Sequence, residues 1–261
     1  MRIERLNALL DGGSVYGPEA SYHVVRFVEG GCVADIVADV RAQGLQYLVF
    51  LDERFFADSA CVSGLCEGLQ DGGLNVLWSA KLGHMPDSET LRRMRLAGCQ
   101  RIGVTMAGAP WSEALERARK FGFDVRLESE DGFVRESGAA SYTVEERAET
   151  ARRLPGSHAA QFDLAVALFK AGRYGEVMHP LGKAMTLRFP MNELCLNLLA
   201  CLGAAKRYPD MAAGLLAQAG HGWPHPVVLR NRSLLKSWAA SGGDVRGTRL
   251  KLEPESTGAV L

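Results

Sequence analysis

The sequence predicts an α/β domain with a parallel sheet, followed by an all-α domain of helical repeats. Two patterns support this prediction. In the first half, short apolar segments alternate with helical ones, and in the second half, residue types recur every 34 positions. Alternation of strands and helices is typical of parallel sheets with right-handed crossover connections. The chain has 261 residues, 47% of them apolar, which is enough to bury a core in each domain.

The first domain is expected over residues 1–128. YLVFLD is predicted to be a strand because it is an apolar run with β-branched and aromatic residues, and SETLRRMRLAGC is predicted to be a helix that ends at a glycine. The next segment, 129–142, is polar and contains glycine, so we interpret it as a linker. In order, the predicted elements are a weak strand YHVVRF, the helix VADIVADVRAQG, the strand YLVFLD, the helix SACVSGLCEGLQDGG, the strand NVLWSAKLG, the helix SETLRRMRLAGC, the strand RIGVTMAG, the helix WSEALERARKFG and the strand FDVRLES.

The second domain, residues 143–261, has the period of 34 residues. Each unit is predicted to form a helix, a short turn and a second helix, with basic residues at the end of the first helix, where the helix dipole is negative. We place the units at about 159–192, 193–226 and 227–245, before a polar C-terminal tail. The matching positions include Arg173 and Arg207, Tyr174 and Tyr208, Pro190 and Pro224, and the trio Asp163, Asn197 and Asn231.

This period resembles that of tetratricopeptide repeats, which are stacked helical hairpins. Ala200 and Ala212 stand where that family has small residues for close packing, whereas Phe162 replaces its usual tryptophan. The resemblance implies a protein partner, because stacked repeats form extended binding surfaces. The candidate partner-binding residues are Phe162, Phe169, Tyr174, Asn197 and Tyr208, with burial in the core as the alternative for several of them.

Five segments of the first domain follow one another in a familiar order between about residues 24 and 128. They are VADIVADV, YLVFLDERF, VLWSAKLG, LRRMRLAGC and RIGVTM. Their order resembles the core of radical S-adenosylmethionine enzymes, in the branch that carries a cobalamin-binding domain. The resemblance implies a partial (βα) barrel with parallel strands.

The cysteines depart from that family. Its iron–sulfur cluster needs three thiolates from a CxxxCxxC loop, and the six cysteines here, at positions 32, 61, 66, 99, 195 and 201, include no such spacing. We therefore expect no cluster, no metal site and no radical chemistry. His221 and His225 are four residues apart, but they lie in a proline-containing segment with no third ligand nearby. No cofactor is expected, with S-adenosylmethionine as the alternative ligand.

Polar residues nevertheless follow three of the predicted strands. Asp52 and Glu53 come directly after YLVFL, and Lys81 and Thr105 stand near the ends of the next two strands. The carboxyl ends of parallel strands face the ligand crevice in α/β folds. These four residues are therefore the candidate ligand-binding residues, with solvated loop residues as the alternative interpretation.

Charge and hydropathy exclude some classes of partner. Thirty basic and thirty acidic residues cancel, so no net charge attracts nucleic acid or an anionic membrane. No apolar run approaches the roughly 20 residues that a membrane span needs. Scattered cysteines in a chain with a large apolar fraction indicate reduced thiols, so we expect a cytoplasmic protein.

Two functions follow from these patterns. The first is a non-catalytic scaffold, a degenerate radical-enzyme half-barrel fused to repeats that bind another protein. The second is a radical enzyme or an S-adenosylmethionine or small-molecule binder whose cluster-binding segment is missing or lies upstream, in which case this chain is a fragment of a longer protein. An open edge strand also provides a reason to form a homodimer or to be covered by the repeats.

Overall fold

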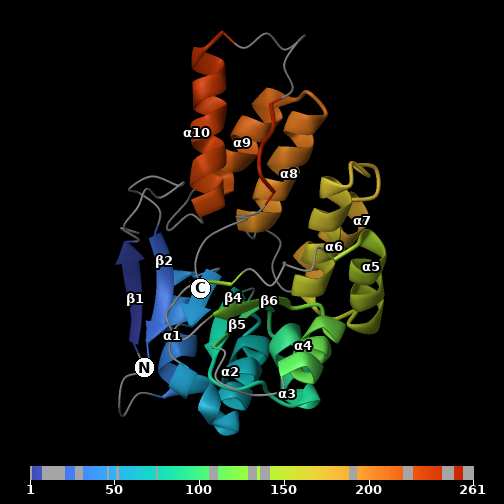
Figure 1. Ribbon diagram of the computed structural model, residues 1–261. Helices are drawn as coiled ribbons and strands as arrows, with labels where there is room; N and C mark the ends of the chain where they lie inside the picture. The colour runs from blue at the N-terminus through green and yellow to red at the C-terminus, as the bar shows by residue number, and fades with distance from the viewer. Residues whose placement is uncertain are drawn as a thin grey trace.

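The structure is a computed structural model. It describes residues 2–7, 21–26, 32–45, 47–50, 53–74, 76–105, 111–128, 134–135, 142–187, 193–219, 226–242 and 250–254. In these ranges the chain forms an α/β part followed by a helical part (Figure 1). This arrangement confirms the order of the two predicted fold types.

A sheet of seven strands, in chain order, forms the centre of the α/β part within the described ranges. The strands are β1 (Arg2–Asn7), β2 (Ser21–Arg26), β3 (Tyr47–Phe50), β4 (Leu77–Leu82), β5 (Cys99–Thr105), β6 (Asp124–Glu128) and β7 (Val134–Arg135). Strands β2 to β6 run parallel to one another, as the alternation of strands and helices predicts. Strands β1 and β7 pair antiparallel at the two edges.

The two edge strands were not expected from the sequence. β7 lies inside the segment 129–142 that we interpret as a linker, and it pairs with Leu127 and Glu128 of β6. β1 pairs along its whole length with β2, the weak strand YHVVRF of the sequence. The sheet therefore continues beyond the strands that apolar runs predict, because an edge strand needs only backbone pairing and little burial.

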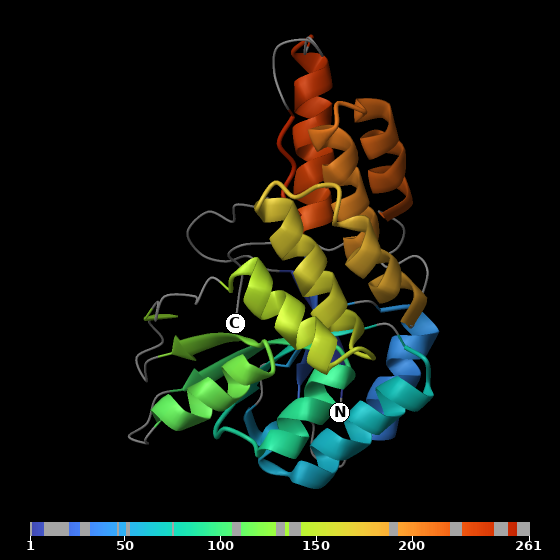
Figure 2. The ribbon, with the colours of Figure 1, turned by 90° about the vertical axis from the view of Figure 1, so that its right-hand side faces the viewer.

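Helices α1 (Val33–Gln43), α2 (Ser59–Asp71), α3 (Ser88–Leu96) and α4 (Trp111–Lys120) connect successive parallel strands. They lie together on one face of the sheet (Figure 1 and Figure 2). This follows from the strand order, because right-handed crossovers between adjacent strands always pass on the same side. A (βα) barrel has the same strand order, and the partial barrel itself stays a prediction.

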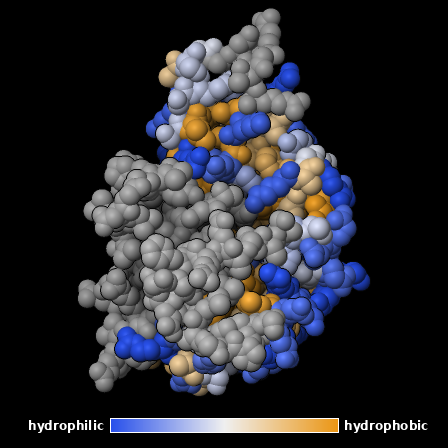
Figure 3. Space-filling model, in the orientation of Figure 1, coloured by the Kyte–Doolittle hydropathy of each residue, from blue (hydrophilic) through white to orange (hydrophobic). Residues whose placement is uncertain are grey.

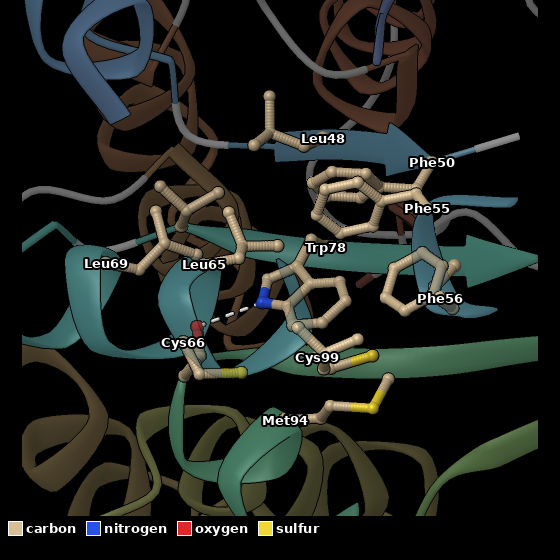
Figure 4. Close-up of a cluster of buried hydrophobic side chains, with 14 of the residues drawn as sticks. Leu48, Phe50, Phe55, Phe56, Leu65, Cys66, Leu69, Trp78, Met94 and Cys99 are labelled. Carbon is tan, nitrogen blue, oxygen red and sulfur yellow. Dashed lines mark hydrogen bonds between the residues drawn. The ribbon is translucent and has the colours of Figure 1, made fainter. Parts of the chain in front are cut away.

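Aromatic side chains fill the space between β3, β4 and these helices (Figure 4). Phe55 and Phe56 belong to a short 3-10 turn, η1 (Glu53–Ala57), and their ring centroids lie 5.1 and 5.6 Å from that of Phe50. The Phe50 ring also contacts Trp78 of β4, with centroids 5.4 Å apart. The chain after β3 thus turns its phenylalanines into the core and leaves Glu53 near the strand end.

The helical part contains, over the described residues, the hairpins α6–α7 and α8–α9, preceded by one helix and followed by another (Figure 1). The helices are α5 (Val144–Arg153), α6 (His158–Lys170), α7 (Met178–Leu187), α8 (Glu193–Ala205), α9 (Pro209–Ala219) and α10 (Pro226–Ala240). FDLAVALFKAGRY and LNLLACLGAAKRY fall mainly in the first helices of two hairpins, and PDMAAGLLAQAG forms most of a second helix, as predicted. The tetratricopeptide relationship itself stays a prediction.

Charged side chains connect the helical part to the α/β part. Arg95 near the end of α3 donates to the carboxylate of Asp163 on α6, and both side chains are buried. Asp163 also accepts hydrogen bonds from Gln100 Nε2 at 2.8 Å and from Arg147 Nη1 at 3.3 Å. Arg147, on α5, reaches Asp124 at the start of β6 with Nη2 at 2.6 Å from Oδ1. These contacts lie at the N-terminal ends of β5 and β6, away from the edge where ligands bind in α/β folds.

Candidate functional site

A short segment near the C-terminus, residues 250–254, lies against α8 and α10. Figure 1 shows it as a red trace between α10 and α8. Leu252 is 6% exposed and joins the core of the helical part, and Pro254 is also buried. We call residues 250–254 the tail segment.

Two asparagines hold the backbone of the tail segment. Asn231 on α10 accepts a hydrogen bond from the Glu253 N–H with Oδ1 at 2.9 Å, and it donates from Nδ2 to the Glu253 carbonyl at 2.6 Å. Asn197 on α8 donates from Nδ2 to the carbonyls of Glu253 and Pro254, at 3.0 and 3.1 Å. A side-chain amide offers a carbonyl acceptor and two N–H donors, so it can pair with both the N–H and the carbonyl of a peptide group. The pair therefore binds main chain and does not depend on the side chains it carries.

The two asparagines also contact each other. Asn231 Nδ2 lies 2.7 Å from Asn197 Oδ1, and the two residues are 34 positions apart. Both side chains are fully buried. Since burial of an unpaired amide is unfavourable, the tail segment completes the hydrogen bonding of this pair. We call Asn197 and Asn231 the asparagine pair.

The same repeat position in the first unit has another partner. Asp163, 34 residues before Asn197, is buried on α6, and it pairs with Arg95 of the α/β part. One position of the repeat thus carries a buried polar side chain in three successive units. In each unit that side chain meets a group from outside the repeat, namely Arg95 in the first and the tail segment in the other two.

Side chains next to the asparagine pair contact the tail segment as well. Arg230 Nη2 lies 3.1 Å from Glu253 Oε1, and both side chains are 29% exposed. Cys201 Sγ, one turn after Asn197, donates to the Glu253 carbonyl at 3.2 Å. On the face that Figure 3 shows, apolar and charged residues alternate over α8 to α10. The site therefore binds the backbone of the tail segment, pairs the Glu253 carboxylate with Arg230 and buries the Leu252 side chain.

The five predicted partner-binding residues fall into different environments. Phe162 is buried, and Asn197 is buried against the tail segment, which is the core alternative for both. The rings of Phe169 and Tyr174 pack together with centroids 5.2 Å apart. Tyr208 is 60% exposed after α8. Sequence reasoning missed Arg230, Cys201 and Glu253, although the period already aligned Asn231 with Asn197.

Two of the four residues predicted at the strand ends contact each other. Lys81 Nζ of β4 lies 3.2 Å from Glu53 Oε1 in η1, and both side chains are partly exposed. Gly83 permits this approach, since a Cβ atom there would lie 3.3 Å from Glu53 Oε2. Thr105 is the last residue of β5, at the same edge of the sheet. Asp52 lies outside the described residues.

Along β4, two polar side chains alternate with side chains of the core. In β4, Trp78, Ala80 and Leu82 join the core under the helices, whereas Ser79 and Lys81 alternate with them. Strands of a parallel sheet covered on both faces are normally apolar throughout. The alternation therefore sets Lys81 on a face suited to polar contacts.

The described cysteines include several buried thiols. Burial raises the pKa of the Cys66 and Cys195 thiols to about 12, and it raises the pKa of Cys99 as well. A thiol with a raised pKa is a poor nucleophile at neutral pH. The described residues include no group of three or more His, Cys, Asp or Glu side chains placed to bind a metal. None of the described helices is long and apolar enough to span a bilayer.

Comparisons with protein-family models, with curated proteins and with solved structures give no significant match. The two family resemblances therefore stay predictions from the sequence. The site has to be interpreted from its own geometry.

Proposed function

We propose that this protein is a non-catalytic scaffold that binds a protein partner through the first helices of its repeats. The observation that carries the proposal is the asparagine pair, which binds the main chain of residues 253 and 254 through both carbonyls and an amide. Main-chain hydrogen bonds are the usual source of affinity when a protein binds an extended segment of polypeptide.

The position of the asparagine pair supports a polypeptide ligand over a small molecule. The two side chains are 34 positions apart and together bind two consecutive carbonyls of one segment. Repeats stacked side by side offer such groups at regular intervals, which suits a linear partner. In this proposal the α/β part, joined to α6 by the Arg95–Asp163 pair, acts as a platform for the repeats.

Affinity capture with chemical crosslinking tests the proposal. The full chain is compared with Asn231→Ala, which removes the contacts to Glu253, and with Lys236→Ala, an exposed change on the same helix as the matched control. We expect at least one protein to be crosslinked to α8 or α10 of the original and Lys236→Ala chains but not of Asn231→Ala. Recovery of this chain alone under several growth conditions contradicts the proposal.

A second candidate function rests on the contact between Glu53 and Lys81. A carboxylate and an ammonium group 3.2 Å apart at the end of parallel strands can bind the ammonium and carboxylate of an amino-acid-like ligand. S-adenosylmethionine carries both groups, and the resemblance to radical enzymes makes it the first ligand to test. Calorimetric titration at millimolar ligand should give binding heat that Lys81→Ala abolishes, and the absence of heat removes this candidate.

A further inference from the structure

We propose that the tail segment is a built-in ligand of the repeats, and that the protein partner presents the same chemistry, an extended apolar–Glu–Pro sequence, and exchanges with it. This inference rests on the proposed scaffold function and specifies its partner. It starts from the occupant that the structure shows on the asparagine pair.

The first step concerns the shape of the ligand. Pro254 disfavours the helical conformation at the residue before it, so Glu253 is biased toward an extended backbone. An extended Glu253 can present its N–H and carbonyl to Asn231 together, as observed at 2.9 and 2.6 Å. Proline itself has no N–H to satisfy. Because the proline already restricts the backbone of Glu253, binding of a Glu–Pro sequence to this site should cost little conformational entropy.

The second step concerns the side chains. Leu252 is buried in the core of the helical part, and the Glu253 carboxylate lies 3.1 Å from Arg230. An apolar residue followed by Glu thus fits the apolar core and Arg230. The asparagine pair adds affinity but does not select side chains. The partner is expected to carry an apolar residue, then Glu, then Pro.

The third step concerns exchange. The described part of the tail contacts α8 and α10 through only a few residues, and the hydrogen bonds that hold it are individually worth about 1 kcal/mol. A tethered segment competes with an external one at an effective concentration on the order of 1 mM. A partner with the same sequence chemistry therefore binds weakly while the tail is bound and more tightly once the tail is released.

Fluorescence anisotropy with a labelled peptide of residues 249–256, RLKLEPES, tests the inference on the full chain. Leu252→Asp is designed to release the tail by placing a charge in the apolar contact. We expect the peptide to bind this variant at least about tenfold more tightly than the original chain. Adding Asn231→Ala to the released chain should weaken binding by about tenfold or more, because the backbone contacts are lost.

Two further comparisons keep the result interpretable. If Leu252→Asp loses its helical circular dichroism signal, Glu253→Lys releases the tail by charge repulsion from Arg230 and leaves the apolar core unchanged. Arg230→Glu should reverse the preference, so that a peptide with Lys in place of Glu253 binds better than the original peptide. This reversal tests recognition of the carboxylate separately from recognition of the backbone.

Equal peptide binding by the original and released chains, or binding that is insensitive to Asn231→Ala, overturns the inference. If the released chain binds no peptide but Asn231→Ala still loses its crosslinked protein, the scaffold function stands and the shared apolar–Glu–Pro chemistry is wrong. If the peptide does not bind and no protein is crosslinked, both the function and its ligand are wrong.

Discussion

Arg95 on α3 and Asp163 on α6, which are 68 residues apart in the chain, form an ion pair in which both side chains are buried. Their contact joins the α/β part to the first repeat. A buried ion pair is an expensive contact to break, because removal of one partner leaves the other charge without compensation in a poorly solvated environment. Removal of either partner alone should therefore destabilise the contact between the two parts.

Asp163→Leu should lower the free energy of unfolding by about 3–5 kcal/mol, since Arg95 and Arg147 then lose a shared carboxylate. Asp163→Asn, which installs the residue found at positions 197 and 231, is the matched control and should cost less because it keeps an acceptor. Urea denaturation followed by circular dichroism measures both. An unfolding midpoint for Asp163→Leu equal to that of the original chain contradicts the prediction, and Arg95→Met in the same chain should recover part of the loss.

Asp124 should give stability a specific acid dependence. Burial opposes ionisation of Asp124, but the charges of Arg147 and Arg101 outweigh it and hold its pKa below the ordinary 3.8. A carboxyl with a lowered folded-state pKa stabilises the fold above its unfolded pKa, and that contribution is lost as pH falls through the folded pKa. The stability difference between the original chain and Asp124→Asn should therefore be largest near pH 7 and shrink below about pH 4. A difference that stays constant down to pH 3 argues against it.

Asn231→Ala should release the tail segment from α8 and α10. The Glu253 amide loses its acceptor, and Asn197 loses a buried neighbour, so hydrogen exchange at residues 250–254 should become fast. Leaving buried groups unpaired should also cost about 1–3 kcal/mol of stability. Exchange measured by mass spectrometry on the C-terminal peptide checks the first effect. Lys236→Ala, exposed on the same helix, should leave exchange unchanged.

Arg207→Gly should stabilise the protein. Arg207 has φ = 67°, a left-handed conformation, in the turn between α8 and α9, whereas the turn after α6 has Gly172 at φ = 74°. Glycine adopts this conformation without a Cβ penalty, so the gain should be about 0.5–1 kcal/mol. Thermal unfolding measures the change. Lys206→Gly, one residue earlier, gains nothing from glycine and should lower the unfolding temperature, so a similar response of both variants contradicts the explanation.

Thiol labelling should separate the cysteines by burial. Cys32 is exposed, whereas burial raises the pKa of Cys66 and Cys195 to about 12. Iodoacetamide at pH 8 should therefore modify Cys32 first and reach the buried thiols only after unfolding, because the thiolate is the reacting form. Peptide mapping by mass spectrometry follows the order. Cys66 or Cys195 labelled in the folded protein as fast as Cys32 would contradict the buried packing.

Local patterns predicted the parallel strands and the helices well. YLVF and LWSAKL are short, mostly apolar runs, and the repeat helices recur with the period of 34 residues, so residue type alone indicates these elements. The strands at the edges escaped prediction because β1 and β7 are held by backbone pairing with β2 and β6, which leaves little trace in residue type.

The candidate site was predictable only in part. The sequence aligned Asp163, Asn197 and Asn231, and it placed Glu53 and Lys81 near strand ends. It gave no sign that Asn197 and Asn231 would hold Glu253, or that Glu53 would be the carboxylate beside Lys81. These contacts join segments that are far apart in the sequence, so they depend on how the whole chain folds.

The amino-acid sequence by itself determined the parallel strands, the helices that connect them and one polar repeat position, because these properties depend on neighbours a few residues away or on the period of 34. Only the tertiary structure decided what the polar position meets, Arg95 in one repeat and the tail segment in the next two. The physical reason is that a buried amide or carboxylate must find a hydrogen-bond partner, and that partner is whatever the fold brings within about 3 Å.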